Sequence, residues 1–470
     1  MLALSMAAYS TFHCMALSFD HATNNRFQVV QRTAPESDES LPLSINVETA
    51  GSLKELLGDN MLKVDTLTVD GTVNNDDLYT LFTSSLKGRL KVLDMGKAIM
   101  EGGKIPAKAF YHASEQSYEK YGTVFIAPIQ LEKITLPSNV TEIGDFAFMN
   151  EFSLKEIVFP EALVRIGDGA FSSCRNFCMN PLVFPPNIEV IGEQAFDNCL
   201  SLEAEVVLPQ SIRRIEGGAF YVCHIQKINF PEGLEYIGMV AFSGNNLTEV
   251  NLPDGCELES EFGSQFSTNY NLKRIRLPEG ITSVPNKICN ECNELEEAYI
   301  PRSATRIGTR AFDGCGKLLK VDIPEGVTEI ANGAFHNCES LGELTFPSSL
   351  SNIGPSCFYG CRGVKRIECK AIVPPACCRD KNNPWLTPFG TEISTGIGVY
   401  IPEGTKESYK SAWGWNSFTN FIETDGSSSV EGPAVDFRHT DGTVYDISGQ
   451  KVTNPQPGRI YIRDGRKYIE

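Results

Sequence analysis

A unit of about 23 residues recurs through the middle of this chain. It reads Leu-x-x-Ile-x-Phe-Pro, then Val or Leu, Ile-Gly, Ala-Phe, and a Cys before the next Leu. Ten copies at one period predict a stack of similar coils rather than a single compact core. The copies are marked by prolines spaced 22 to 25 residues apart: Pro137, Pro160, Pro185, Pro209, Pro231, Pro253, Pro278, Pro301, Pro324 and Pro347.

The opening half of each unit predicts a short strand. Its Ile and Phe are two residues apart and therefore point to the same face. One such strand cannot bury that face, but stacked copies can pair in parallel about 4.8 Å apart and enclose a continuous core. We therefore expect a solenoid with a parallel concave sheet. Ala-Phe should place a ladder of rings on the opposite wall, as core residues: Phe148, Phe171, Phe196, Phe220, Phe242, Phe312, Phe335 and Phe358.

The segment from Ile323 to Cys338 reads Ile-Pro-Glu-Gly-Val-Thr-Glu-Ile-Ala-Asn-Gly-Ala-Phe-His-Asn-Cys. This motif resembles the BspA-like leucine-rich repeats of surface proteins from oral and gut bacteria. The resemblance covers roughly Leu90 to Arg362. It implies a leucine-rich-repeat solenoid and a role in adhesion to host or bacterial proteins.

Composition changes along the chain divide it into six segments. We interpret residues 1–20 as the remnant of an export signal, 21–89 as an N-terminal cap and 90–363 as the repeats. Residues 364–423 would form a C-terminal cap, 424–432 a Ser/Gly-rich linker, and 433–470 a small β-rich module. All three tryptophans, Trp385, Trp413 and Trp415, lie in the predicted C-terminal cap, where bulky rings would cover the open end of the core.

The net charge of −18 argues against two classes of partner. The 59 acidic side chains outnumber the 41 basic ones, and this negative charge repels phosphate backbones and anionic lipid surfaces. No apolar run reaches the roughly 18 residues that would cross a bilayer. We expect no nucleic-acid partner and no transmembrane segment, and predict an exported monomer that is secreted or held at the bacterial cell surface.

Cysteine positions favour free thiols over disulfides in the repeats. Seven of the fifteen cysteines occur fourteen residues after a repeat proline, in one structural slot: Cys174, Cys199, Cys223, Cys292, Cys315, Cys338 and Cys361. Stacked copies of one slot have parallel Cα–Cβ vectors, which is unfavourable for a disulfide. Cys369, Cys377 and Cys378 in the predicted C-terminal cap are the better disulfide candidates.

No motif for catalysis or metal binding stands out. The six histidines are scattered, and Cys289 and Cys292 fall on core slots of the repeat. Neither a Gly-x-Ser-x-Gly turn nor a phosphate-binding loop is present. We predict that the chain is not an enzyme and holds no metal or cofactor.

Two rows of side chains on the strands should face solvent. The row just before each Ile alternates in charge, which favours pairing between neighbouring strands: Glu205, Lys227, Glu249, Arg274, Glu297, Lys320, Glu343 and Arg366. The row two residues before each proline, here called the central lane, is more varied: Thr135, Val158, Val183, Val207, Asn229, Asn251, Arg276, Tyr299, Asp322, Thr345 and Glu368.

Arg and Tyr are enriched at binding hot spots. We therefore predict a partner-binding site on the central lane at Asn229, Asn251, Arg276 and Tyr299. The alternative for this lane is that a solvated strand tolerates any residue. The predicted function is a protein-binding scaffold for adhesion. The alternative is a surface glycan-binding protein, or an accessory protein of an uptake system, with the tryptophans of the cap as stacking platforms.

Overall fold

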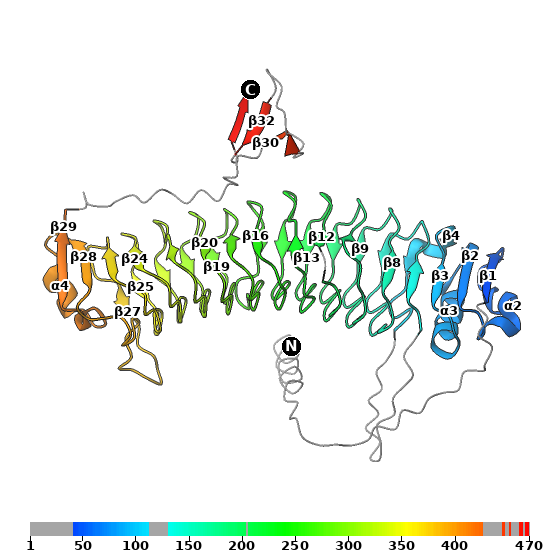
Figure 1. Ribbon diagram of the computed structural model, residues 1–470, viewed down its shortest axis with the longest axis horizontal. Helices are drawn as coiled ribbons and strands as arrows, with labels where there is room; N and C mark the ends of the chain where they lie inside the picture. Colours follow the sequence, from blue (N-terminus) through cyan, green and yellow to red (C-terminus); the bar gives the residue numbers. More distant parts are fainter. Residues whose placement is uncertain are drawn as a thin grey trace, which may run out of the picture. The chain divides into compact units, whose positions relative to one another are not determined.

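A computed structural model describes residues 41–111, 130–203 and 205–425, together with four strands between Val444 and Ile469. The described residues between 41 and 425 form about 15 coils of parallel strands with little helix, a β-solenoid (Figure 1). The fold class predicted from the repeat is confirmed. The expected export remnant at 1–20 and residues 426–432 of the expected linker lie outside the described residues.

The first wall of the solenoid carries one parallel strand per coil. Its strands are β1 (Pro42–Val47), β2 (Thr66–Val73), β3 (Val92–Asp94), β6 (Lys133–Thr135), β8 (Glu156–Val158), β10 (Leu182–Val183), β12 (Glu205–Val207), β14 (Lys227–Ile228), β16 (Glu249–Asn251), β18 (Arg274–Arg276), β20 (Glu297–Tyr299), β22 (Lys320–Val321), β24 (Glu343–Phe346), β26 (Arg366–Cys369), β28 (Gly398–Pro402) and β29 (Asn420–Thr424). Backbone pairing is interrupted between β8 and β10, between β14 and β16, and between β22 and β24. The first wall is thus made of four shorter parallel sheets.

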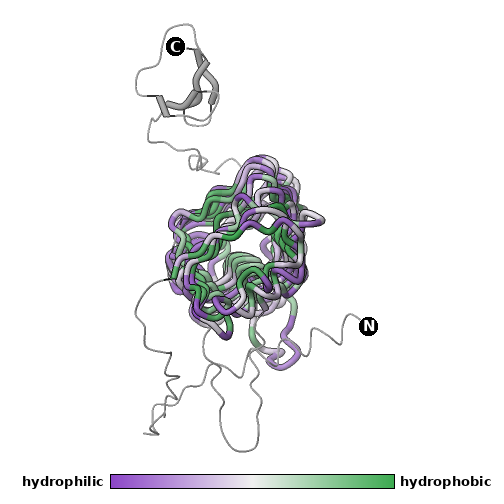
Figure 2. Tube along the Cα trace, turned by 90° about the vertical axis from the view of Figure 1, so that its right-hand side faces the viewer, coloured by the Kyte–Doolittle hydropathy of each residue, from purple (hydrophilic) through white to green (hydrophobic). Residues whose placement is uncertain are grey.

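A second wall of two-residue strands, which the sequence analysis does not predict, faces the first. It contains β5 (Lys104–Ile105), β7 (Glu142–Ile143), β9 (Arg165–Ile166), β11 (Val190–Ile191), β13 (Arg214–Ile215), β15 (Tyr236–Ile237) and β17 (Glu257–Leu258), then β19 (Ser283–Val284), β21 (Arg306–Ile307), β23 (Glu329–Ile330), β25 (Asn352–Ile353) and β27 (Ala376–Cys377). Viewed along the stack, hydrophobic positions of successive coils superimpose on these walls (Figure 2).

Short elements flank the coils. Toward the N-terminus these are α2 (Leu53–Leu57), η1 (Gly58–Asn60), α3 (Asn75–Lys87), β4 (Ala98–Met100), which pairs with β2, and η2 (Glu101–Gly103). Toward the C-terminus they are α4 (Lys406–Ser411) and η3 (Trp415–Ser417). Strands β30 (Val444–Asp446), β31 (Lys451–Val452), β32 (Ile460–Arg463) and β33 (Arg466–Ile469) form a separate antiparallel sheet, of the small β-rich kind that the sequence predicts.

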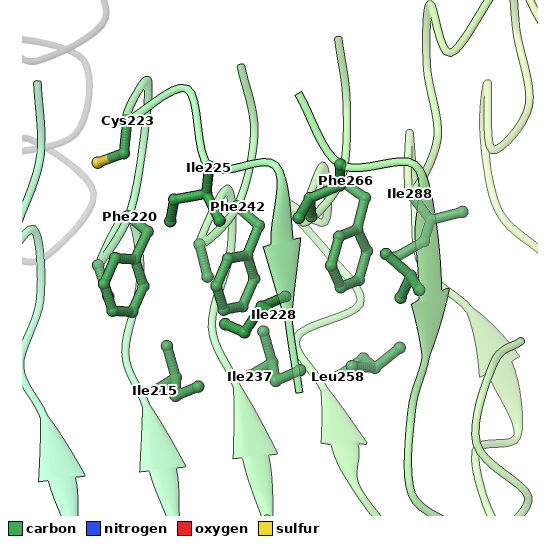
Figure 3. Packing of buried hydrophobic residues seen from close by; sticks show 14 of the residues in the cluster. Ile215, Phe220, Cys223, Ile225, Ile228, Ile237, Phe242, Leu258, Phe266 and Ile288 are labelled. Atoms are coloured by element: carbon green, nitrogen blue, oxygen red, sulfur yellow. The ribbon is translucent and has the colours of Figure 1, made fainter. Parts of the chain in front are cut away.

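The phenylalanine ladder is buried core, as predicted. Consecutive rings from Phe110 to Phe266 stack with centroids 5.1 to 5.6 Å apart. Figure 3 shows Phe220, Phe242 and Phe266 in one row, with aliphatic side chains beside them. The structure adds Phe110, Phe266 and Phe389 to the predicted ladder.

The cysteine slot is a hydrogen-bonding position. The Cys338 thiol donates to the carbonyl of Phe312 in the preceding coil at 3.2 Å, and the other six predicted cysteines make the same bond. All seven are buried and free, as expected.

In the first full coil the slot holds Glu151, whose buried carboxyl has no hydrogen-bond partner, and burial raises its pKa well above the usual range.

In two coils the slot holds Asn instead, and both follow a coil with a shortened turn. Most coils have two residues between the slot and the next Leu, so that Leu donates its N–H to the slot carbonyl, as Leu295 does to Cys292 at 3.0 Å. The turns ending at Ile225 and Leu247 have only one residue there. Their N–H groups donate instead to the side-chain oxygens of Asn245 and Asn269, at 2.8 and 3.1 Å.

Asn269→Cys is therefore expected to destabilise the protein, although Cys occupies this slot in seven other coils. The thiol could still donate to Phe242, but the buried N–H of Leu247 would lose its acceptor, at a cost of about 1–3 kcal/mol. Inserting a Gly between Asn246 and Leu247 should recover most of this loss by restoring the local turn bond. Urea unfolding of the three variants measures it, with the insertion alone as control. Equal stability of Asn269→Cys and the parent would contradict this account.

The cysteines of the C-terminal cap are also free, so the expected disulfide among Cys369, Cys377 and Cys378 is not formed. Cys369 is buried and accepts a hydrogen bond from the Tyr409 hydroxyl at 3.1 Å. Cys378 is exposed. The distinct environments of these thiols give them separate roles in packing rather than a common crosslink.

Alkylation should divide the described thiols by exposure. Burial raises the pKa of Cys361 and Cys256 to about 12, so few of these thiols ionise at pH 8 and reagents cannot reach them. Iodoacetamide at pH 8 should modify the exposed Cys178 and Cys378 first. Peptide mass spectrometry at several times, with a urea-unfolded control, resolves the order. Rapid modification of Cys338 in the folded protein would contradict the buried slot.

Candidate functional site

Three of the four predicted site residues lie side by side on the first wall. Asn251 on β16 is in register with Arg276 on β18, and Arg276 is in register with Tyr299 on β20. Asn229 directly follows β14, which belongs to a different sheet because β14 and β16 do not pair. The structure therefore brings together Asn251, Arg276 and Tyr299 and places Asn229 across a break in backbone pairing.

Arg276 is held in place by three contacts. Its Nη1 donates to the carbonyl of Leu252 at 2.8 Å, and its Nη2 donates to Asp254 Oδ1 at 2.7 Å. Its guanidinium carbon lies 5.6 Å from the centroid of the Tyr299 ring, within cation–π range. The arginine side chain is about one-quarter exposed, so part of this fixed group remains open to a partner.

Tyr299 is held by an acidic side chain from the preceding coil. Its hydroxyl donates to Glu279 Oε1 at 2.5 Å. Partial burial, and then the bond to this carboxylate, raise the pKa of Tyr299. Burial would raise the pKa of Asp254, but hydrogen bonds from Arg276 and from the backbone N–H of Glu279 hold it below its usual value. Asp254 therefore stays ionised and the Tyr299 hydroxyl stays protonated at neutral pH, as their hydrogen bonds require.

The two asparagines of the predicted site differ in their bonding. The Asn229 side chain accepts from Leu208 N at 2.8 Å and donates to Leu208 O at 2.9 Å, which mimics a backbone pair. In other coils the N–H that corresponds to Leu208 N donates to the backbone carbonyl of the lane residue in the following coil, as Leu277 N does to Tyr299 O. Asn251 is exposed, and its amide makes no hydrogen bond to another described residue. Asn229 thus has a structural role, whereas the Asn251 amide is available.

The charged row beside the central lane is partly self-neutralised. Lys227 pairs with Glu205 at 2.8 Å and Arg274 pairs with Glu249 at 3.1 Å, as the alternation predicts. Lys320, however, binds Asp322 of the central lane, which directly follows its strand, at 2.7 Å. Arg366 likewise binds Glu368 at 3.1 Å. Ion pairs between residues two positions apart therefore neutralise Asp322 and Glu368 of the lane.

A hollow at one corner of the coils was not predicted. It has a volume of about 550 Å³ and is lined by Thr248, Tyr270, Asn271, Lys273, Asn293 and Glu294. These residues lie in turns that lead into β16, β18 and β20. The signal that could have located it is the 22-residue spacing of the coils just before it, which marks the shortened turns.

The tryptophans do not form the common platform that the glycan alternative requires. Trp415 is fully buried, and its Nε1 donates to the carbonyl of Pro375 at 2.9 Å. Its ring packs against Phe389 and Tyr409. Trp413 is covered by the Arg379 guanidinium, 4.5 Å from its ring, and only Trp385 is largely exposed. Trp415 is therefore a core residue, as predicted, whereas the exposed Trp385 does not cover the core as the sequence analysis expects.

Neither a metal site nor a membrane span is found in the part of the chain that the structure describes. Within residues 41–111, 130–203 and 205–425, no three His, Cys, Asp or Glu side chains are grouped so that they could hold a metal ion. The helices of these residues are too short or too polar to cross a bilayer.

Stacked parallel coils with this repeat define a leucine-rich-repeat β-solenoid. The family model for the BspA type leucine rich repeat region matches residues 104–204, 191–319 and 305–373, and so covers more than half of the chain. The chain belongs to the BspA-type leucine-rich-repeat family. No curated protein matches it in sequence.

Several solved structures resemble the chain. A leucine-rich repeat protein from Bacteroides ovatus is 28% identical over 51% of this chain and 79% of its own, with a TM-score of 0.33. A leucine rich cell surface protein from Faecalibacterium prausnitzii is 23% identical over 57% and 83%, with a TM-score of 0.34. The pneumococcal vaccine antigen PcpA is 18% identical over 70% and 86%, with a TM-score of 0.42.

The two lane asparagines should respond differently to truncation. Asn229→Ala removes both bonds to Leu208 and should lower the free energy of unfolding by about 1–2 kcal/mol. Asn251→Ala, which breaks no such bond, should change it by less than about 0.5 kcal/mol. Urea denaturation followed by circular dichroism compares them directly. Equal effects of the two substitutions would show that the bonds from Asn229 to Leu208 do not stabilise the fold.

Proposed function

We propose that this chain is an exported, bacterial protein-binding scaffold that acts in adhesion at the cell surface. The partner would lie along the central lane at Asn229, Asn251, Arg276 and Tyr299. The observation that carries the proposal is the fixed contact between Arg276 and Tyr299 on adjacent strands, beside the available amide of Asn251. Membership of the BspA-type family supports a scaffold role.

Fixing the side chains in advance favours binding. Ordering a long side chain on association costs about 0.5–1.5 kcal/mol, and Arg276 is already held by Leu252 O and Asp254. Tyr299 is held in the same way by Glu279. A partner would therefore meet an aromatic ring and a guanidinium in set positions, which are side chains typical of interface hot spots. Asn229 would contribute chiefly by extending the pairing of β12 and β14 through its bonds to Leu208.

The second wall supplies a matched control for this proposal. There Arg214 on β13 is in register with Tyr236 on β15, and its guanidinium lies 4.2 Å from the tyrosine ring centroid. The residue types and the cross-strand contact are the same as on the central lane. If binding depended only on residue types, the two Arg–Tyr pairs would contribute equally to the affinity. If the binding site lies on the first wall, only Arg276 and Tyr299 contribute.

The double variant Arg276→Ala/Tyr299→Ala is expected to bind a protein partner more than about 30-fold more weakly, the loss typical of hot-spot residues. Partners are first captured with the full chain from extracts of host mucosal and bacterial surface proteins. Affinity for each purified partner is then measured by biolayer interferometry. Arg214→Ala/Tyr236→Ala should leave the affinity within about twofold. Unchanged binding by the first-wall variant, or an equal loss in the control, would overturn the proposed site.

A further inference from the structure

The corner hollow is a consequence of turn length. In the coil that leads into β16, Asn246 alone separates the slot residue Asn245 from Leu247. In the next coil both Tyr270 and Asn271 occupy the corresponding turn. The shorter turn sets its corner back, so the longer turn rises beside it as a rim. The Tyr270 side chain lies on this rim and is 52% exposed.

The rim is anchored by the buried Asn269, which immediately precedes Tyr270. The Asn269 Nδ2 donates to the carbonyls of Phe242 and Phe266, both at 2.9 Å. Its Oδ1 accepts from Leu247 N in the shortened coil. The same side chain therefore holds both turns that bound the hollow. A large aromatic ring is thus presented from a fixed backbone rather than from an unsupported loop.

The polar groups around this ring are not used inside the protein. The side chains of Thr248, Asn271, Lys273 and Asn293 make no hydrogen bond or ion pair with another described residue. The central lane differs, because Arg276 and Tyr299 are bonded to neighbouring coils. On the far side of the hollow, Glu294 is paired with Lys317 at 2.6 Å. The hollow therefore gathers free hydroxyl, amide and ammonium groups beside one exposed ring.

We propose that this hollow is a saccharide-binding site. A tyrosine ring offers an apolar face for the C–H face of a pyranose, and its hydroxyl can also hydrogen-bond. The two amides can donate to and accept from neighbouring sugar hydroxyls, while Lys273 can only donate, to a hydroxyl oxygen or a carboxylate. A volume of about 550 Å³ lies within the usual range for small-ligand sites. The side chains of Thr248, Asn271, Lys273 and Asn293 in the lining disfavour a purely apolar ligand.

This site is separate from the proposed protein-binding lane and does not depend on it. It is also distinct from the tryptophans of the C-terminal cap. Tyr270 lies in a turn, whereas Asn251, Arg276 and Tyr299 lie on strands. A variant of either surface should leave the other active, so failure of one proposal can be told from failure of the other.

Saturation-transfer NMR on the full chain tests the site with four probes at millimolar concentration: maltotriose, cellotriose, chitotriose and sialyllactose. At least one should bind the parent protein. Tyr270→Ala should weaken that binding at least tenfold, and Asn271→Ala/Asn293→Ala should weaken it as well, whereas Tyr270→Phe should retain most of it. Tyr79→Ala is the matched control, because Tyr79 is also exposed, at 68%, and lies on α3 away from the hollow.

The proposal fails if none of the four saccharides binds, or if Tyr270→Ala binds as tightly as the parent and the Tyr79→Ala control. Circular dichroism and thermal unfolding confirm that each variant is folded; Asn271→Ala/Asn293→Ala provides an independent readout should Tyr270→Ala be unstable. An unchanged saccharide affinity in Arg276→Ala/Tyr299→Ala is expected. Capture of unstructured peptides by the hollow in place of all four sugars would also overturn it.

Discussion

Every coil of this solenoid depends on its neighbours for both its apolar contacts and its backbone hydrogen bonds. The rings of the phenylalanine ladder stack 5.1 to 5.6 Å apart over much of the array, and the N–H beside each ring bonds to the next coil, as Phe148 does to Ala170 at 2.7 Å. The cysteine slot adds a hydrogen bond from the thiol to a backbone carbonyl of the preceding coil. Because a single coil has no core of its own, these inter-coil contacts determine which changes in length the repeat can accept.

Turn length is the clearest example of that dependence. Removal of one residue before Ile225 or Leu247 takes away a local acceptor for a buried N–H, and an asparagine in the following coil replaces it. Loss of a buried hydrogen bond costs more than a change of side chain in the slot, so Asn takes the place of Cys at these two positions. The same shortening produces the corner hollow. Shortening one turn thus changes the hydrogen bonding of buried groups and also the shape of the surface beside that turn.

The parts of the fold that repeat in side-chain identity were predictable, whereas those that repeat only in backbone conformation were not. The rings and the buried thiols recur as Phe and Cys and were recognised as core. Two residues before each ring the backbone is left-handed, yet this position holds Gln194, Val240 and Arg310 among others, so no pattern marked it. Asn229 was expected to face a partner because its lane is exposed. Its side chain instead pairs with the backbone of Leu208, just beyond the paired strands β12 and β14, and nothing in the residue pattern distinguishes this asparagine from Asn251.

Internal bonding also separates the two candidate surfaces. On the central lane, hydrogen bonds within the protein fix Arg276 and Tyr299. Because most of their donors are already used, a partner would recognise these side chains mainly by their shape. A broad protein surface can use such groups, because a fixed ring and guanidinium can pack against a partner and exclude water without new hydrogen bonds. In the hollow the backbone is fixed through Asn269, while the side chains keep their donors and acceptors. A small polar ligand needs those directed bonds, since it buries too little area to bind without them.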